Sequence, residues 1–471
     1  MDRHGLDLAA PRVVPILDSK FSPAVLARRA FLARARVTGQ AVPAQLAIEQ
    51  ADGAVFGVQT QLFPEHSRDA VENERHLERL AKFLLWSIGG HRIYMAGPRG
   101  LAARLQAHYQ QNPSGKFDSE IVGRRIHGKP VEVVDVSPAE VPSNRSCSKA
   151  LGRHLEGCRI GFDLGGSDRK VAAVQDGKVI FSEEQPWDPS QQSDPQYHID
   201  GIQESLRKAA AYLPRVDAIG GSAAGVYVNN EVKVASLFRA VPQGVFERRV
   251  KKLFLEIQKA WGAIPFEVVN DGEVTALAGS MRLGKNAVLG LALGTSLAAG
   301  YVTPDGKITS WLNELAFTPI DYSPQATVDE WSGDRGVGVQ YLSQQAVCRL
   351  LVPAGISSDP MRSAAEKLQL VQELMASGDE RAQKIYQTLG TYLGYAVADY
   401  ACFYDFNDAL VLGRVMSGPG GEVIIRCARE VLKVEFPELE NRVSFHVPDE
   451  KLRRHGQAIA AASLPPLPKK S

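Results

Sequence analysis

The sequence of 471 residues lacks the features that mark several protein classes. It has no run of about 18 apolar residues, so we expect no membrane-spanning helix and no membrane as a partner. Its N-terminal residues contain no apolar segment long enough for a secretory signal peptide. Its five cysteines show neither metal-ligand nor redox spacing, which indicates a reduced, cytoplasmic compartment.

An excess of charge of one sign is also lacking. Lys and Arg number 54 and Asp and Glu number 53, which gives a formal net charge of +1. Because nucleic-acid-binding proteins carry an excess of positive charge, we expect no nucleic acid as a partner. Hydrophobic residues make up 44% and charged residues 23%, as in an ordinary globular protein. At roughly 150 residues per domain, the length allows about three domains.

Glycine is abundant, with 42 residues, and part of it belongs to a repeat. Residues 158–184 read as strand, Gly-Gly-Ser turn, strand, Asp-Gly turn and strand, and residues 287–310 repeat this order with a Gly-Thr-Ser turn. The last strand of the second unit is expected at 307–310. Gly165 and Gly294 are 129 residues apart, as are Asp176 and Asp305. This common spacing predicts a duplicated domain.

Helical patterns at 199–212 and 246–261 alternate with strands, which predicts a layered α/β fold. Asp163 ends the first strand, immediately before the first glycine turn. Backbone N–H groups of such a turn can approach phosphate oxygens, and a carboxylate beside them can hold a hydrated Mg²⁺ ion. Of Arg169 and Lys170 only one can face this site, because side chains alternate along a strand. The alternative is a plain hairpin without a ligand.

Asp271 lies between an apolar strand and a helical pattern at 274–281. A carboxylate at such a junction is held rigidly and suits a general base that takes a proton from a hydroxyl attacking phosphorus. The alternative is that Asp271 only caps the helix.

These motifs resemble those of the ROK family, which belongs to the hexokinase and actin-like ATPase superfamily. Asp163 to Lys170 is similar to its first phosphate motif, residues 293–300 to its second, and Asn270-Asp271 to its catalytic Asn-Asp pair. The resemblance covers residues 158–464. It implies two ribonuclease-H-like α/β lobes with a cleft between them. The first lobe would span 158–283 with a closing helix at 453–464, and the second would span 284–452.

The resemblance also implies a function. A ROK sugar kinase transfers the γ-phosphoryl group of ATP to a sugar hydroxyl, with Asp271 as general base and Mg²⁺ bound to Asp163 through water. Sugar and ATP would be the partners, and a homodimer is implied. The implied substrate-binding residues are Asn270, Glu314 and Gly225. The implied ATP- and phosphate-binding residues are Asp163, Gly165, Gly166, Ser167, Lys170, Gly294, Thr295, Ser296 and Gly413.

Three departures from the family pattern lead to a second hypothesis. Phe317 stands where the family has a histidine, and the zinc motif would fall on residues 332–337, where Ser332 and Val337 replace cysteines. No histidine lies between His198 and His446, so we expect no zinc. Gly413 is followed by residues with side chains rather than by the usual glycines. The alternative function is therefore a non-catalytic, sugar-sensing regulatory protein of the same fold.

Residues 1–150 are expected to form an additional α/β domain. A hairpin around Asp52-Gly53, a helix at 72–88 and a strand at 91–97 repeat the order seen at 170–225. Two interpretations are open: a degenerate third copy of the half-domain, or an unrelated α/β extension. The arginines of residues 22–36 are interpreted as a solvated helix face.

Overall fold

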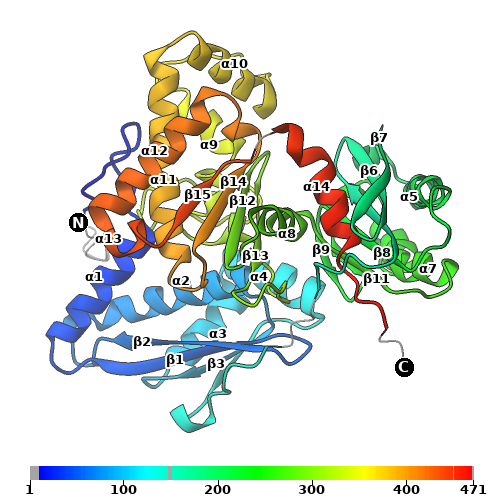
Figure 1. Cartoon of the computed structure of the whole chain (residues 1–471). Coiled ribbons are helices and arrows are strands. Elements are labelled where there is room, and N and C mark those ends of the chain that lie inside the picture. Colours follow the sequence, from blue (N-terminus) through cyan, green and yellow to red (C-terminus); the bar gives the residue numbers. More distant parts are fainter. Residues whose placement is uncertain (1–9, 147–150, 449, 469–471) are drawn as a thin grey trace. The chain divides into compact units, whose positions relative to one another are not determined.

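The computed structural model describes residues 10–146, 151–448 and 450–468. The chain forms two compact units (Figure 1). Unit 1 comprises residues 1–147, 292–298 and 310–447, and unit 2 comprises residues 148–291, 299–309 and 448–471. Unit 1 thus combines the N-terminal region with most of the expected second lobe, and the expected division at 150, 158–283 and 284–452 stays a prediction.

Unit 2 is built on a five-stranded sheet with the order β11-β8-β5-β6-β7. The first repeat forms the antiparallel strands β5 (Cys158–Leu164), β6 (Asp168–Gln175) and β7 (Lys178–Pro186), as predicted. Strands β8 (Ala218–Ala223) and β11 (Phe266–Asn270) add to β5 in parallel. Asp176 and Gly177 have φ angles of 45° and 77°, which a two-residue hairpin turn of type I′ requires.

Helices flank this sheet. The remaining elements of unit 2 are α5 (Pro195–Ala210), β9 (Val226–Val228), β10 (Glu231–Val234), α6 (Gln243–Val245), α7 (Leu253–Ala260), α8 (Asp271–Leu283) and α14 (Glu450–Ala462). The helix predicted at 246–261 is interrupted, because residues 246–250 form a π-helical turn and α7 begins only at Leu253. Helix α14 lies directly on the sheet: Cβ atoms at Gly161 and Gly220 would come within 1.8 and 1.7 Å of its carbonyl oxygens.

The N-terminal region of unit 1 is a four-stranded sheet, β2-β1-β3-β4, with helices packed on it. β1 is antiparallel to β2 and β3, and β3 is parallel to β4. The predicted hairpin, helix and strand are confirmed. The elements are α1 (Ala24–Val37), β1 (Val42–Glu49), β2 (Val55–Leu62), α2 (Glu72–Ser87), β3 (Arg92–Ala96), α3 (Leu101–Gln111), α4 (Pro113–Asp118) and β4 (Glu132–Asp135).

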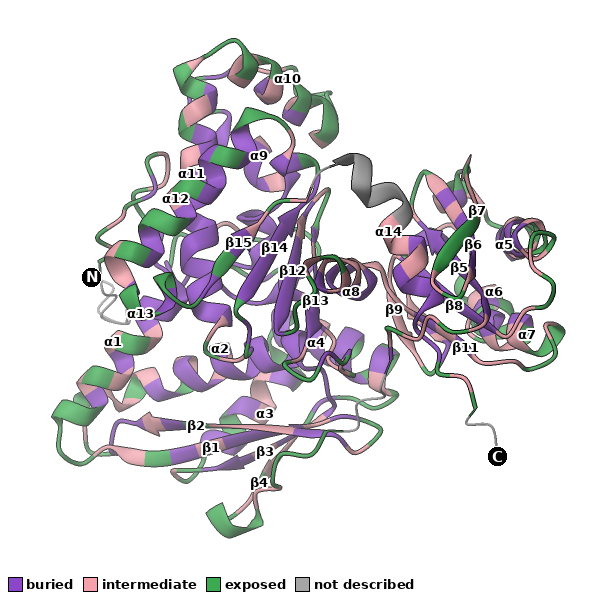
Figure 2. Ribbon diagram, viewed as in Figure 1, coloured by how far each residue is buried: buried purple, intermediate pink, exposed green. Residues whose placement is uncertain are grey.

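The second repeat contributes to a sheet with the order β13-β12-β14-β15. Figure 2 shows that strand β14 is completely buried, in contrast to α10, most of whose residues are exposed or partly exposed. The elements are β12 (Val288–Leu293), β13 (Leu297–Val302), α9 (Gln344–Leu350), α10 (Ala364–Ala376), α11 (Glu380–Tyr400), β14 (Asp408–Leu412), α12 (Pro419–Glu435), α13 (Pro437–Glu440) and β15 (Ser444–His446).

The prediction of a strand at 307–310 is wrong. Only an isolated bridge between Val302 and Ile308 forms there. The chain beyond it is bound by the N-terminal region instead, because the Leu312 N–H donates to the Ile88 carbonyl (3.0 Å) and the Ser310 hydroxyl donates to Gln50 (2.8 Å).

The predicted solvated face holds for Arg29 and Arg36 of α1, which are exposed. Arg28 and Arg34, in contrast, form less exposed ion pairs. Arg28 lies 2.7 Å from Asp399, and both side chains are largely buried. Arg34 lies 2.9 Å from Asp69 and 2.8 Å from Glu72. Helix α1 is thereby tied to the rest of unit 1. Within the described part of the chain, none of the helices combines the length and apolar character that crossing a membrane requires.

Candidate functional site

The first predicted phosphate turn lies between β5 and β6 of unit 2. The Gly165 N–H donates to the Asp168 carbonyl (2.9 Å), and the Trp187 indole N–H donates to the Gly165 carbonyl (2.8 Å). Gly166 and Ser167 are exposed, and no heavy atom lies within 4 Å of the place where a Cβ of Gly166 would be. The turn is therefore held in shape at Gly165 while its backbone stays open at Gly166, as a phosphate cradle requires.

Asp163 is buried at the end of β5 and is bound on both carboxylate oxygens. The Ser222 hydroxyl donates to its Oδ1 (2.6 Å), and the Lys170 Nζ lies 3.6 Å from its Oδ2. Burial raises the pKa of Asp163, whereas Ser222 and Lys170 act to lower it. The site therefore contains a carboxylate whose charge is already partly balanced by the protein.

Lys170, and not Arg169, lies on the face of β6 that carries the site. Its Nζ lies 2.7 Å from Asp168 Oδ1, in addition to its contact with Asp163. Arg169 points to the other face, where it pairs with Glu204 (2.6 Å). This resolves the choice that the alternation of side chains left open.

Asn270 is the N-cap residue of α8. Its Oδ1 accepts from the Gly272 N–H (2.7 Å), and its Nδ2 donates to the Gly225 carbonyl (2.7 Å). The alternative in which Asp271 caps the helix is therefore wrong, since Asn270 fills that position and Asp271 is the first residue of the helix proper. Asn270 also links the helix start to Gly225, which has a φ of 131°.

Asp271 is a partly buried carboxylate with few partners. The Gly272 N–H donates to it (3.0 Å), and its own backbone N–H acts in the same way; both act to lower its pKa. Burial, and then the nearby charge of Asp163, raise its pKa to about 6. Burial and the charge of Asp271 in turn raise the pKa of Tyr227, whose hydroxyl donates to the Ala224 carbonyl (3.0 Å). A carboxylate with this pKa can accept a proton near neutral pH.

The second predicted phosphate turn, Gly294 to Ser296, lies in unit 1 between β12 and β13. The Gly294 N–H donates to the Ser296 carbonyl (2.9 Å), and the Gly294 carbonyl accepts from the Gln344 N–H (2.9 Å). Thr295 and Ser296 are exposed. This turn thus resembles the first one in having a closed base and an exposed tip.

Gly413 lies at the end of β14 with a φ of 105°. A Cβ there would come within 2.3 Å of the Leu293 carbonyl oxygen. The packing of β14 against β12 therefore requires glycine at this position, independently of any nucleotide. Arg414 and buried Val415 begin a short 3-10 helix, and the Arg414 carbonyl accepts from Gln372 (2.8 Å).

Glu314 lies in unit 1 just before a short 3-10 helix, and its N–H donates to the Trp86 carbonyl (2.9 Å). Phe317, at the position of the family histidine, packs against Trp86 and Trp331 with ring centroids 4.5 and 5.0 Å apart. An aromatic cluster, partly supplied by α2, therefore supports the segment that carries Glu314.

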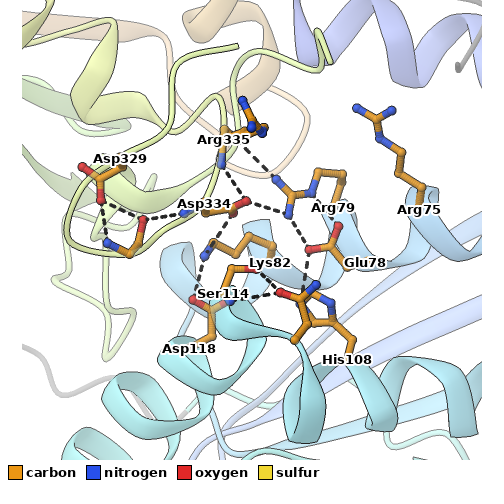
Figure 3. A network of polar contacts seen from close by, with 12 residues as sticks. Arg75, Glu78, Arg79, Lys82, His108, Ser114, Asp118, Asp329, Asp334 and Arg335 are labelled. Carbon is orange, nitrogen blue, oxygen red and sulfur yellow. Dashed lines mark hydrogen bonds and ion pairs between the residues drawn. The ribbon is translucent and has the colours of Figure 1, made fainter. Parts of the chain in front are cut away.

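The segment at the position of the family's zinc motif is held by charged side chains of α2 (Figure 3). Asp334 Oδ1 lies 3.1 Å from Arg79 Nη2, and Asp334 Oδ2 lies 3.2 Å from Lys82 Nζ. Ser332, which replaces a cysteine, donates to Asp329 (2.7 Å). Ion pairs and hydrogen bonds thus fix this loop in unit 1.

The predicted site residues fall into two groups. Asp163, Lys170, Asn270, Asp271 and Gly225 come together in unit 2, whereas the second turn, Glu314 and Gly413 lie in unit 1.

Sequence reasoning missed two residues of the unit 2 group. One is Ser222, which the parallel register of β5 and β8 places beside Asp163; the glycine-rich run at 221–225 marks this region in the sequence but does not give the register. The other is Tyr227, for which the sequence carries no signal.

Among the described residues, no group of three or more His, Cys, Asp and Glu side chains could hold a metal ion. Mg²⁺ in phosphoryl-transfer sites requires only one or two carboxylates, because water and phosphate supply the other ligands. Asp163, beside the open turn at Gly166, fits this requirement.

Comparison with known proteins places the fold. No family model and no curated protein matches this chain. A ROK hexokinase from Thermus thermophilus matches with a TM-score of 0.51 and 16% identity, over 65% of this chain and 96% of that one. The chain has the fold of the ROK proteins. A ROK-family transcriptional regulator, a homologue of the E. coli MLC protein, matches with a TM-score of 0.51 and 19% identity, over 66% of this chain and 79% of that one. The ROK-like fold thus occurs in both kinases and regulators.

Proposed function

We propose that the protein is an ATP-dependent carbohydrate kinase that transfers the γ-phosphoryl group to a hydroxyl of a sugar or sugar derivative. The strongest support is Asp271, whose pKa is raised to about 6 and whose carboxylate accepts hydrogen bonds from backbone N–H groups at the start of α8. Asn270, and not Asp271, is the N-cap residue of α8. The carboxylate of Asp271 is therefore not required for capping and can act as a general base.

Asp271 would accept the proton of the sugar hydroxyl as its oxygen forms a bond to phosphorus and the bond from phosphorus to the ADP oxygen breaks. The open turns at Gly166 and at Thr295 would bind phosphate oxygens through backbone N–H groups. Asn270 and Glu314 would bind sugar hydroxyls, Asn270 through the second hydrogen of its amide. Asp163 would hold Mg²⁺ through water, and the ion would neutralise phosphate charge.

Lys170 has a role different from simple phosphate binding in this proposal. Its ammonium group lies between Asp163 and Asp168, so it limits the negative charge that the two carboxylates would otherwise present to the phosphates. Ser222 acts in the same direction through its hydrogen bond to Asp163.

The first test is Asp271→Asn. We expect this variant to lose phosphoryl transfer by at least two orders of magnitude, the size of a general-base contribution, while sugar binding persists. Transfer is measured as ADP release from Mg-ATP over a panel of sugars and amino sugars, and sugar binding by calorimetry. Asp200→Asn, which removes an exposed carboxylate of α5, is the matched control and retains activity. Full activity of Asp271→Asn would refute the assignment.

The alternative function, a non-catalytic sugar sensor, is favoured by one region. Gly413 is accounted for by its packing against Leu293, and Arg414 and Val415 follow it where a nucleotide-binding motif would have glycine. A sensor would bind sugar but not ATP. Thermal stabilisation by a sugar, with none by Mg-ATP and no ADP release, would favour this alternative over the kinase.

The remaining expectations about partners stay predictions. They are a cytoplasmic location, a homodimer, and no binding of nucleic acid. Sedimentation at several protein concentrations measures the oligomeric state.

A further inference from the structure

A cavity of about 500 Å³ lies in unit 1, and none of the residues discussed so far as phosphate ligands lines it. Its walls come from α2, from α3 and from two stretches of the loop that follows Glu314, residues 321–324 and 333–335. Arginine is unusually frequent among these walls, so we call the cavity the arginine pocket. Its arginines are Arg75, Arg79, Arg104 and Arg335.

Two of these arginines are already neutralised. Arg79 forms ion pairs with Glu78 (2.5 Å) and Asp334 (3.1 Å). Arg104 lies 3.5 Å from Glu74, at exposed positions of both side chains. These pairs form the structural part of the pocket.

The other two, Arg75 and Arg335, form no ion pair with any described residue. Arg75 Nη2 donates to the Tyr322 carbonyl (2.7 Å), and Arg335 Nη1 donates to the Ala326 carbonyl (3.2 Å). In Figure 3 both guanidinium groups extend away from the network of ion pairs that links Arg79 to Asp334. The pocket therefore offers two guanidinium groups with most of their N–H donors unused.

The position of Arg75 is electrostatically unfavourable in the free protein. Burial, and then the neighbouring charge of Arg79, lower the pKa of Arg75, and the charges of Glu78 and Glu72 offset this only in part. A bound anion would supply the missing negative charge. The planar donor array of a guanidinium group matches the oxygens of a phosphate or carboxylate.

The other polar side chains of the pocket favour an anion that also carries hydroxyl groups. The Ser323 side chain, and the carboxylates of Glu74 and Glu78, stand beside the arginines and can exchange hydrogen bonds with hydroxyl groups. The volume falls in the range of small-molecule sites, roughly 300–1,000 Å³. A bare anion would leave much of the pocket unfilled.

We propose that the arginine pocket is a second ligand site, which binds a small phosphorylated polyhydroxy compound through Arg75 and Arg335. The phosphate would bridge the two guanidinium groups, and the hydroxyl groups would face Glu74, Glu78 and Ser323. The site does not depend on the proposed kinase activity, since none of these residues belongs to the phosphate turns or contacts Asp271.

Binding there would act on the loop that carries Glu314. Residues 333–335 belong to the segment that Arg79 and Lys82 fix through Asp334. A ligand that joins Arg75 of α2 to Arg335 would fasten this segment further to α2.

The test is calorimetric titration of the full chain with three probes: glucose 6-phosphate, inorganic phosphate and glucose. We expect glucose 6-phosphate to bind, inorganic phosphate to bind at least tenfold more weakly, and the affinity for glucose 6-phosphate to fall as salt rises. Tighter binding of inorganic phosphate than of glucose 6-phosphate would overturn the ligand class, and absence of binding by both would overturn the site.

Variants locate the binding. Arg335→Gln changes an exposed side chain, so we expect this variant to fold normally. We expect it to bind glucose 6-phosphate at least fivefold more weakly. Arg75→Gln should weaken it at least tenfold, and Arg75→Lys by less. Arg125→Gln is the matched control, with unchanged affinity, since Arg125 is half exposed and lies outside the pocket.

The same titration on Asp271→Asn separates the arginine pocket from the proposed catalytic site. Retained affinity in Asp271→Asn together with lost affinity in Arg335→Gln supports the proposal. The reverse pattern, affinity lost in Asp271→Asn and retained in Arg335→Gln, places the phosphate in the catalytic site and overturns it.

Discussion

The buried ion pair of Lys82 and Asp118 should be essential for the stability of unit 1. Lys82 Nζ lies 2.6 Å from Asp118 Oδ1, and the two side chains are 1% and 0% exposed. The same oxygen accepts from the Trp86 indole N–H (2.9 Å). The change Lys82→Met keeps the length of the buried aliphatic chain but removes its charge, so the effect is electrostatic rather than a cavity.

The expected loss is large because it leaves a carboxylate buried without a countercharge. Removing one partner of a buried ion pair costs about 3–5 kcal/mol. Asp334 loses a contact as well but keeps Arg79. The matched control is Arg124→Met, which breaks a pair with Glu120 at 3.8 Å between half-exposed side chains and should cost less than about 1 kcal/mol.

Urea unfolding followed by tryptophan fluorescence measures the free energy of unfolding. Hydrogen exchange of peptides from α2 and α4 shows which transition has moved, since a chain with two compact units need not unfold in one step. We expect α2 and α4 to lose protection in Lys82→Met and to keep it in Arg124→Met.

The pH dependence gives a second check. Burial raises the pKa of Asp118 even in the intact pair, and loss of Lys82 removes a charge that lowers it. A carboxyl group whose pKa is raised by folding binds more protons in the folded than in the unfolded state. The destabilisation that it causes therefore decreases as pH falls. The loss in Lys82→Met should therefore be smaller at pH 5 than at pH 8.

A double-mutant cycle decides the mechanism. Asp118→Asn removes the charge and keeps an acceptor for the Trp86 indole, so it should recover part of the stability when added to Lys82→Met. The reasoning is refuted if Lys82→Met and Arg124→Met lose equal free energy of unfolding. It is also refuted if Asp118→Asn lowers the free energy of unfolding of Lys82→Met by as much as it lowers that of the unmodified protein.

Three further predictions concern the site and its support. Because the pKa of Asp271 is raised to about 6 and a base must be deprotonated, kcat/KM should rise with pH through 6 and stay level above 7; a profile flat from pH 5 to 8 would contradict this. Ser222→Ala removes a 2.6 Å hydrogen bond to Asp163 and should raise the KM for Mg-ATP while sugar affinity stays constant; an unchanged KM would argue against it. Gly161→Ala should lower Tm by several degrees, because the added Cβ would meet an α14 carbonyl at 1.8 Å, whereas Gly166→Ala, with open space, should leave Tm unchanged; equal Tm values would count against this packing.

Local sequence patterns predicted much of the fold, because the correctly predicted strands and helices are determined by residues close to one another in the sequence. The strands around Asp176-Gly177 follow from a turn that needs positive φ angles. The strand expected at 307–310 failed for a tertiary reason, since Leu312 is paired with Ile88, 224 positions away in the chain. No periodicity within the segment carries that information.

In the candidate site, too, some features could be predicted from the sequence and others depend on the tertiary structure. The resemblance of the motifs implied that Asp163 and Asp271 belong to one site, and the charge of Asp163 does raise the pKa of Asp271, as expected of neighbours. Which residue caps α8 was not predictable, because Asn270 and Asp271 are both good N-cap residues and only the backbone geometry separates them. The role of Ser222 depends on the parallel register of β5 and β8, which the sequence does not specify.

The N-terminal sheet bears on the hypothesis of a degenerate third copy. Its order β2-β1-β3-β4 equals the order β7-β6-β8-β11 of unit 2 with β5 removed. The strand directions also agree. β3 is antiparallel to β1, as β8 is to β6 through β5, and β4 is parallel to β3, as β11 is to β8.

The missing strand is the one that carries Asp163, so a copy without it would keep a hydrophobic core and lose the phosphate turn. Superposition of residues 40–100 on 170–225 tests this hypothesis. A Cα path that departs after the hairpin would favour an unrelated extension.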